Sequence, residues 1–92
     1  MSKQDDIKRA LDALGQIPGD AHQMANSTDF SSRVRAAAAE LKRIQMPYDA
    51  GQLVDRAKRL ADGADHQTGI LKGVMLYQAK EDIFAAAALA AI

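Results

Sequence analysis

The sequence contains no cysteine and no tryptophan, and only two prolines, two tyrosines and two phenylalanines among its 92 residues. Without cysteine the chain can form no disulfide and offers no thiolate, so we expect a reducing, cytoplasmic compartment. The first residues, MSKQDD, also lack the apolar run of a signal peptide. Because aromatic side chains are so few, the elements of the core must pack closely or share contacts with a partner.

Long hydrophobic runs and catalytic motifs are absent as well. The uncharged run at the end of the sequence, residues 83–92, has ten residues, whereas a membrane-spanning helix needs about 20. No glycine-rich phosphate loop, His-Glu-x-x-His or G-x-S-x-G motif occurs. The nearest approach to a metal site is Asp62, Asp65 and His66, which we interpret as polar residues between helices. We therefore expect no membrane anchor, no enzyme, no cofactor and no bound metal.

Apolar residues recur with helical spacing along nearly the whole chain, and no strand-like alternation is present. The spacing predicts an all-α fold, a small bundle of three to four helices that forms a single helical domain over residues 1–92. The helices are expected at about 3–14, 29–45, 50–62 and 69–91, with a loop over 15–28. Ser2 and Asp5 form the expected first cap, and Gly15 the expected end of the first helix.

The predicted centre of the bundle is a hairpin of two helices joined by the sequence MPYD. Each helix has one apolar stripe with alternating spacings of four and three residues, typical of helix pairs. Asp49 and Gln52 are the expected cap of the second helix, and Gly63 is expected to stop or bend it. The stripes consist of Phe30, Val34, Ala37, Leu41 and Ile44 in the first helix, and of Leu53, Ala57, Leu60 and Ala64 in the second, where Val54 and Ala61 widen the stripe.

The last predicted helix is apolar on nearly all sides. Ile70, Val74 and Tyr77 fall on one face of a helical projection, whereas the charged residues from Lys72 to Asp82 are scattered. Such a helix is either the central helix of the monomer or docks against another chain. We favour docking, and expect a homo-oligomer or a complex with another protein. Large side chains among small ones are the expected partner-binding residues: Met75, Tyr77, Phe84, Leu89 and Ile92. The competing interpretation is that these five form the monomer's own core.

The middle of the chain is basic, with seven Lys or Arg against three acidic residues over 33–59. Such a patch suits phosphate contacts, so a small nucleic-acid-binding regulator is one alternative function. A helix-turn-helix motif fits poorly, because Gly69 and Lys72 stand where that motif has β-branched core residues. The chain as a whole is neutral, and we expect solvated helix faces here. The basic residues are Arg33, Arg35, Lys42, Arg43, Arg56, Lys58 and Arg59.

The sequence MLYQAKEDIFAAAALAAI resembles the C-terminal helices of bacterial axial proteins, namely the flagellar rod and hook proteins and the secretion-needle subunits. In those proteins a Tyr-Gln-Ala stretch precedes an apolar helix that packs into a tubular assembly. The likeness implies a bacterial filament subunit, with Lys80 where the rod and hook proteins usually have Asn. This is a further alternative to our main prediction, a non-catalytic helical module that binds protein through its last helix.

Overall fold

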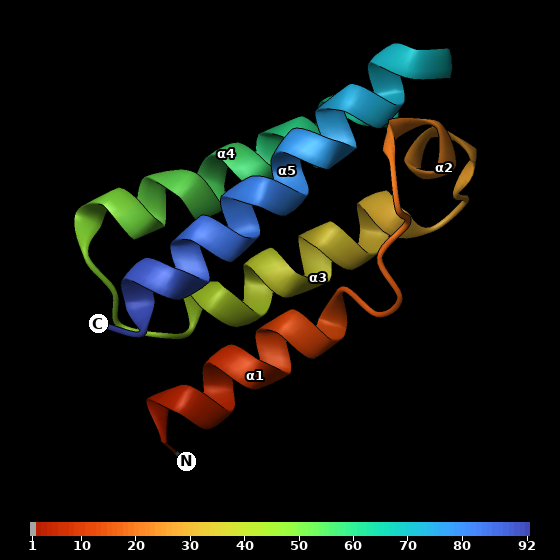
Figure 1. The fold of residues 1–92 in the computed structure, drawn as a ribbon. Helices are drawn as coiled ribbons and strands as arrows, with labels where there is room; N and C mark the ends of the chain where they lie inside the picture. Colours follow the sequence, from red (N-terminus) through yellow and green to blue (C-terminus); the bar gives the residue numbers. More distant parts are fainter. Residues whose placement is uncertain (1) are drawn as a thin grey trace.

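The computed structural model describes residues 2–92, and in this range the chain forms five helices and no strand (Figure 1). This confirms the all-α prediction, although three to four helices were expected. The additional helix, α2, lies within the segment 15–28 that was predicted to be a loop. The helices are α1 (Lys3–Ala13), α2 (Ala21–Asn26), α3 (Phe30–Lys42), α4 (Tyr48–Ala64) and α5 (Gly69–Ala90).

Local hydrogen bonds explain where the first two helices begin and end. The hydroxyl oxygen of Ser2 accepts from the backbone N–H of Asp5, as the predicted cap requires. Gly15 follows the end of α1 with a φ of +65°, a conformation that favours glycine. At α2, the Asp20 carboxylate accepts from the N–H of Gln23, and the Gln23 side chain accepts from the N–H of Gly19. This reciprocal cap stabilises a helix too short for periodicity to reveal.

The third and fourth helices differ from their predicted bounds. α3 ends at Lys42, although the apolar stripe continues to Ile44. α4 already begins at Tyr48, directly after Pro47, so Asp49 lies in its first turn and is not its cap. The helix also continues through Gly63 to Ala64. At Gly63 a Cβ atom would lie 2.8 Å from Cε of Met75, so this glycine serves the contact with α5 and does not end α4.

The last helix occupies the centre of the fold. α5 contacts each of the other four helices, and its pairing with α4 is the most extensive in the molecule. Figure 1 shows α5 between α4 and α3, with α1 along the outer side of α3 and α2 near the start of α5. The hairpin of α3 and α4 is present, but α4 packs more extensively on α5 than on α3. The centre of the fold therefore includes α5, and the predicted hairpin of α3 and α4 forms only part of it.

The core is formed mainly by small side chains. Of the 21 buried apolar residues in the described part of the chain, eleven are alanine. The largest fully buried apolar side chains are those of Phe30, Leu14, Met24, Leu41 and Leu76. On α4 the buried face consists of Ala50, Val54, Ala57, Ala61 and Ala64, whereas Leu53 and Leu60, predicted as its stripe, are only half-buried at its edge. Helices with such faces approach one another closely, which compensates for the small area that each residue buries.

Candidate interaction surface

α5 has one buried face and one exposed face. The buried side chains follow the helical repeat and meet α4, α2, α3 and α1. They are Gly73, Leu76, Ala79, Asp82, Ile83, Ala86, Ala87 and Ala90. Leu76, which is fully buried, was not recognised from the sequence, because a helix apolar on all sides shows no preferred face in projection. The competing view of α5 as a central helix is therefore right for this half of its circumference.

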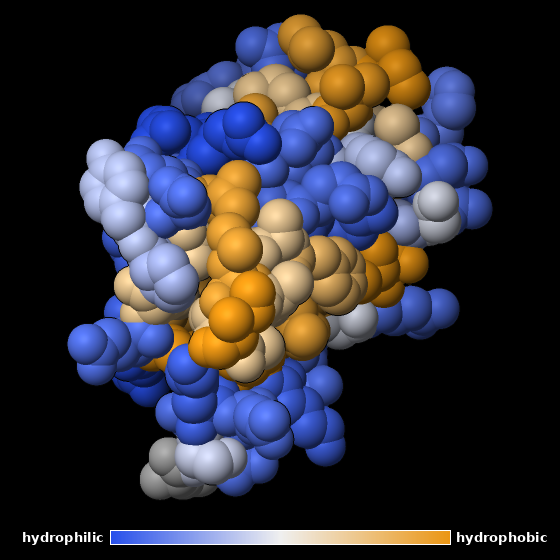
Figure 2. Space-filling view, turned by 60° about the vertical axis from the view of Figure 1, so that its left-hand side comes forward, coloured by the Kyte–Doolittle hydropathy of each residue, from blue (hydrophilic) through white to orange (hydrophobic). Residues whose placement is uncertain are grey.

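The opposite face of α5 is exposed and mostly apolar. Six positions at spacings of 4, 3, 4, 3 and 4 residues form one line along it, which we call the α5 stripe: Ile70, Val74, Tyr77, Glu81, Phe84 and Ala88. All six are exposed. Ile70 and Val74 are each 52% exposed, Tyr77 is 41% exposed and Phe84 is 39% exposed. Figure 2 shows hydrophobic surface at the top, where α5 begins, and in the middle of the view, with hydrophilic surface around both areas.

None of the five predicted partner-binding residues is fully buried. Tyr77 and Phe84 belong to the α5 stripe, and Ile92 is 93% exposed beyond the end of the helix. Met75 and Leu89 lie outside the α5 stripe. Each is half-buried and packs against the core. The structure thus brings Tyr77 and Phe84 together, one helical heptad apart, and separates Met75 and Leu89 from them.

One charged residue, Glu81, interrupts the α5 stripe, and the neighbouring residue Lys80 contacts it. The ammonium nitrogen of Lys80 lies 3.2 Å from Oε1 of Glu81 and 3.9 Å from the centroid of the Tyr77 ring. The Lys80 side chain is largely buried, whereas that of Glu81 is half-exposed. A cation held over an aromatic ring and beside a carboxylate gives the middle of the stripe a fixed pattern of charge.

A groove lies beside the first half of the stripe. Val74, Tyr77 and Gln78 of α5 form one wall, and residues 19–21 at the start of α2 form the other. The groove has a volume of about 440 Å³. Its mixed apolar and amide lining can accept side chains of a helix that lies along the stripe, because partner side chains fill such depressions between helices.

An ion pair between a half-exposed arginine and a buried aspartate joins α4 to α5 on the other side of α5. Arg56 donates from Nε to Oδ2 of Asp82 over 2.7 Å and from Nη2 to Oδ1 over 2.6 Å, and Gln78 donates to the same carboxylate over 3.0 Å. Asp82 is only 2% exposed. The carboxylate raises the pKa of Arg56, first through these hydrogen bonds and then through its charge. Asp82, one of the scattered charged residues of the last predicted helix, is therefore a buried structural anchor.

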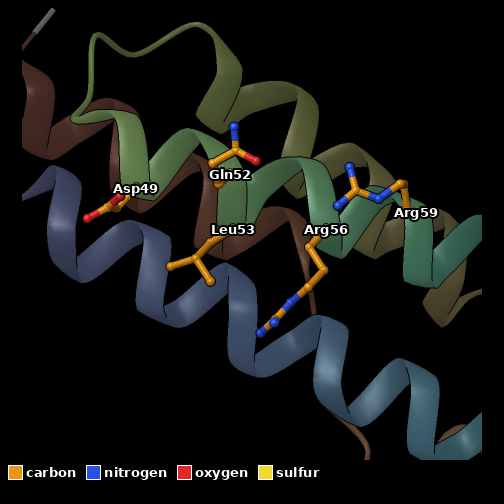
Figure 3. A pocket seen from close by; sticks show the side chains of 5 residues that line it. All are labelled: Asp49, Gln52, Leu53, Arg56 and Arg59. Atoms are coloured by element: carbon orange, nitrogen blue, oxygen red, sulfur yellow. The ribbon is translucent and has the colours of Figure 1, made fainter.

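Figure 3 shows the surface depression next to this ion pair, in which Leu53 and Arg56 point from α4 toward α5. Asp49, Gln52 and Arg59 complete its lining, and its volume is about 400 Å³. Asp82 holds the Nε–Nη2 edge of the Arg56 guanidinium, so this side chain in the lining already serves the contact between α4 and α5. It is best understood as the outer edge of the contact between α4 and α5.

Ion pairs within the chain neutralise most of the basic middle. In the described part of the chain five of the seven basic residues contact carboxylates: Arg33 with Asp29, Arg35 with Asp62 and Asp65, Lys42 with Asp55, Arg43 with Glu40, and Arg56 with Asp82. Arg33 also donates to the carbonyl oxygens of Leu14 and Gln16, at 2.8 and 2.9 Å. These guanidinium groups serve helix contacts, which leaves little of the patch for phosphates.

Two of the three residues considered as metal ligands, Asp62 and Asp65, contact other side chains. Asp65 accepts from the hydroxyl of Ser31 over 2.6 Å and from Arg35 over 2.7 Å. Asp62 lies 3.5 Å from the same guanidinium. Among residues 2–92, no group of three or more His, Asp or Glu side chains is arranged to hold a metal ion. A guanidinium therefore lies where the two carboxylates converge.

Compared with protein-family models, with curated proteins and with solved structures, the chain shows no significant match. Over the described residues, none of the helices is both long enough and apolar enough to cross a membrane. The α5 stripe is the most distinctive feature of the molecular surface.

Proposed function

We propose that the protein is a non-catalytic helical interaction module that binds protein through the α5 stripe. The observation that carries this proposal is the exposure of four large apolar side chains in one line, Ile70, Val74, Tyr77 and Phe84. Single exposed apolar residues are ordinary on protein surfaces, whereas several of them aligned on one face of a well-formed helix are typical of an interaction site.

The spacing of the stripe indicates the kind of partner. Apolar residues at alternating intervals of four and three form the seam of helix pairs, in which side chains of one helix fit between those of the other. The buried half of α5 supports the proposal as well, because it holds the helix firmly in the fold. A partner would therefore meet a rigid face and would not have to order it first.

The proposal can be tested by placing a photoreactive phenylalanine analogue at Ala88, on the stripe, and in a second variant at Ala36 on α3. Both positions are exposed alanines within helices, so the two variants differ mainly in the face they probe. After irradiation of cells that produce each variant, we expect covalent protein adducts from position 88 and few from position 36. Equal yields from the two positions, or no adduct from position 88, would contradict the proposal.

The photo-adducts and a separate DNA-retention measurement distinguish the alternative functions. A filament subunit would give a ladder of adducts at multiples of its own mass, because a head-to-tail contact does not close. A nucleic-acid-binding regulator would be retained on DNA at low salt and released as salt rises. Its retention would survive a charge placed on the stripe at Phe84.

A further inference from the structure

We infer that the occupant of the α5 stripe is the same stripe of a second copy of this chain, with the two α5 helices antiparallel. This inference rests on the proposed function and names the partner for it. The supporting observation is the order of side chains along the α5 stripe. The stripe consists of two series, and within each series the residues are seven positions apart. Ile70, Tyr77 and Phe84 form one series of large residues; Val74, Glu81 and Ala88 form the other.

An antiparallel arrangement matches large residues with smaller ones. In such a pair, residue numbers rise along one helix in the direction in which they fall along the other. One pair of facing residues therefore determines all the other facing pairs. Placing Val74 beside Phe84 of the second copy also places Ile70 beside Ala88, and Tyr77 beside Glu81. Each layer then combines a residue of one series with a residue of the other, as in antiparallel coiled coils. A parallel pair would instead place Phe84 against Phe84 and Ala88 against Ala88.

Charge complementarity supports the same arrangement. Glu81 is the only charged residue of the stripe, and in a parallel pair it would face Glu81 of the second copy. In the antiparallel pair each Glu81 lies beside Tyr77 of the second copy, whose ring already carries the ammonium group of Lys80 at 3.9 Å. Each carboxylate would thus meet a positive charge twice, from its own chain and from the second copy. The arrangement is self-complementary, as a two-fold interface must be.

The size of the stripe indicates a weak, closed dimer. A helix of 22 residues is about 33 Å long, and one helix face of that length covers less than the roughly 800 Å² per partner of a standard interface. We therefore expect association that depends on concentration between about 1 µM and 1 mM. Because the two stripes cover each other completely, assembly ends at the dimer.

The absence of cysteine allows a direct test of partner and direction. We would prepare Ile70→Cys and Ala88→Cys as single variants and oxidise each alone and in an equimolar mixture. Residues 70 and 88 of one chain are about 27 Å apart along α5, too far for a disulfide within the chain. In the antiparallel dimer they meet only between copies. We expect the mixture to give disulfide-linked dimers at several times the yield of either variant alone.

Two controls accompany the oxidation. A mixture of Ala36→Cys with Ala88→Cys gives the background from random collisions. Val74→Asp, introduced into both cysteine variants, should reduce the dimer yield of the mixture to that background while circular dichroism stays helical. If that variant unfolds, sedimentation of the wild-type chain over the same concentrations still decides between a dimer and a monomer.

The outcomes distinguish this inference from the proposed function. Efficient linkage of Ala88→Cys to itself would show a parallel pair and overturn the inference. A mixture that gives only background, together with a photo-adduct of a different protein at position 88, would also overturn it, but the proposed function would stand. Background linkage with no photo-adduct of any kind would remove both.

Discussion

Gly73 of α5 lies directly against the backbone carbonyl group of Ala21, the first residue of α2. A Cβ atom at position 73 would fall well inside the contact distance of the Ala21 carbonyl oxygen and carbon. α2 is held mainly by this approach to α5, since α5 is the helix it contacts most. The absence of a side chain at Gly73 therefore sets the position of α2, and with it one wall of the groove beside the α5 stripe.

Gly73→Ala should destabilise the protein, although alanine is usually the better helix former. The added methyl group meets backbone and not a flexible side chain, so α2 must move, at a cost of about 1 to 3 kcal/mol. Gly51→Ala is the matched control, because a Cβ atom there meets nothing within 4 Å. It should stabilise the fold by about 0.5 to 1 kcal/mol. Thermal unfolding should show shifts of opposite sign, and an equal rise in both variants would show that α2 is not packed as described.

Arg56→Ala should be the most damaging substitution of a basic residue. It leaves the carboxylate of Asp82, which is 2% exposed, with only Gln78 as a hydrogen-bond partner. Removing one partner of a buried charge is strongly destabilising, and because half of the Arg56 side chain is open to water, we expect a clear fall in stability that water partly offsets. Arg59→Ala is the control, since Arg59 makes no hydrogen bond or ion pair among residues 2–92. Urea unfolding should separate the two variants, and similar midpoints would mean that water replaces Arg56 at no cost.

The predictions from the sequence succeeded where one residue type has one local role. Ser2 caps α1, Gly15 follows its end, and Val34 and Leu41 are fully buried on the predicted face of α3. These features depend on neighbouring residues within one helical turn or on a single apolar stripe, so they can be predicted from the sequence alone. The exposed face with Ile70, Val74 and Tyr77 was recognised as one line for the same reason.

Where the predictions failed, a contact between distant segments decides the structure. The predicted stripe of α4 was right for Ala57 and Ala64, which are buried, but it also included Leu53 and Leu60, which lie at the edge of the buried face because the narrow space next to α5 takes small side chains. In the sequence Asp82 is one of several scattered charges. Its buried position follows from the contact with Arg56, which lies 26 residues earlier in the chain. The sequence also could not show that Met75 and Leu89 pack against the core while Tyr77 and Phe84 are exposed, because this difference depends on the neighbours of α5.

Lowering the pH should reduce the free energy of unfolding, because it protonates the carboxyl group of Asp65. The hydroxyl of Ser31 and then the guanidinium of Arg35 hold the pKa of this carboxyl below its ordinary value, which is about 3.9. A lowered pKa in the folded state gives stability that is present above the unfolded value and is lost as pH falls through the folded value. Ser31→Ala should therefore lower the melting temperature at pH 5 to 7, and the difference from wild type should shrink below about pH 4.

Because Asp65 is exposed to solvent, the pH-dependent part of this effect should be small, about 0.5 kcal/mol or 2 to 4 °C. Thr28→Ala is the control, since Thr28 is exposed and its side chain makes no hydrogen bond within residues 2–92. Its difference from wild type should be the same at every pH. A Ser31→Ala difference that is equally constant would mean that Asp65 does not feel the hydroxyl.

The two faces of α5 should respond differently to the loss of a leucine side chain. Leu76→Ala removes a fully buried side chain from a core rich in alanine, and should cost about 2 to 5 kcal/mol because the rigid helices cannot close the cavity. Leu71→Ala, five residues earlier on the same helix, removes a side chain that is 51% exposed and should cost less than about 1 kcal/mol. Unfolding by urea measures both at a protein concentration low enough to keep the chain monomeric. Equal costs would mean that Leu71 is packed as tightly as Leu76, and that the described difference between the buried and exposed sides of α5 is wrong. A large cost for Leu76 alone would establish that the core needs only one face of α5, which leaves the other free for recognition.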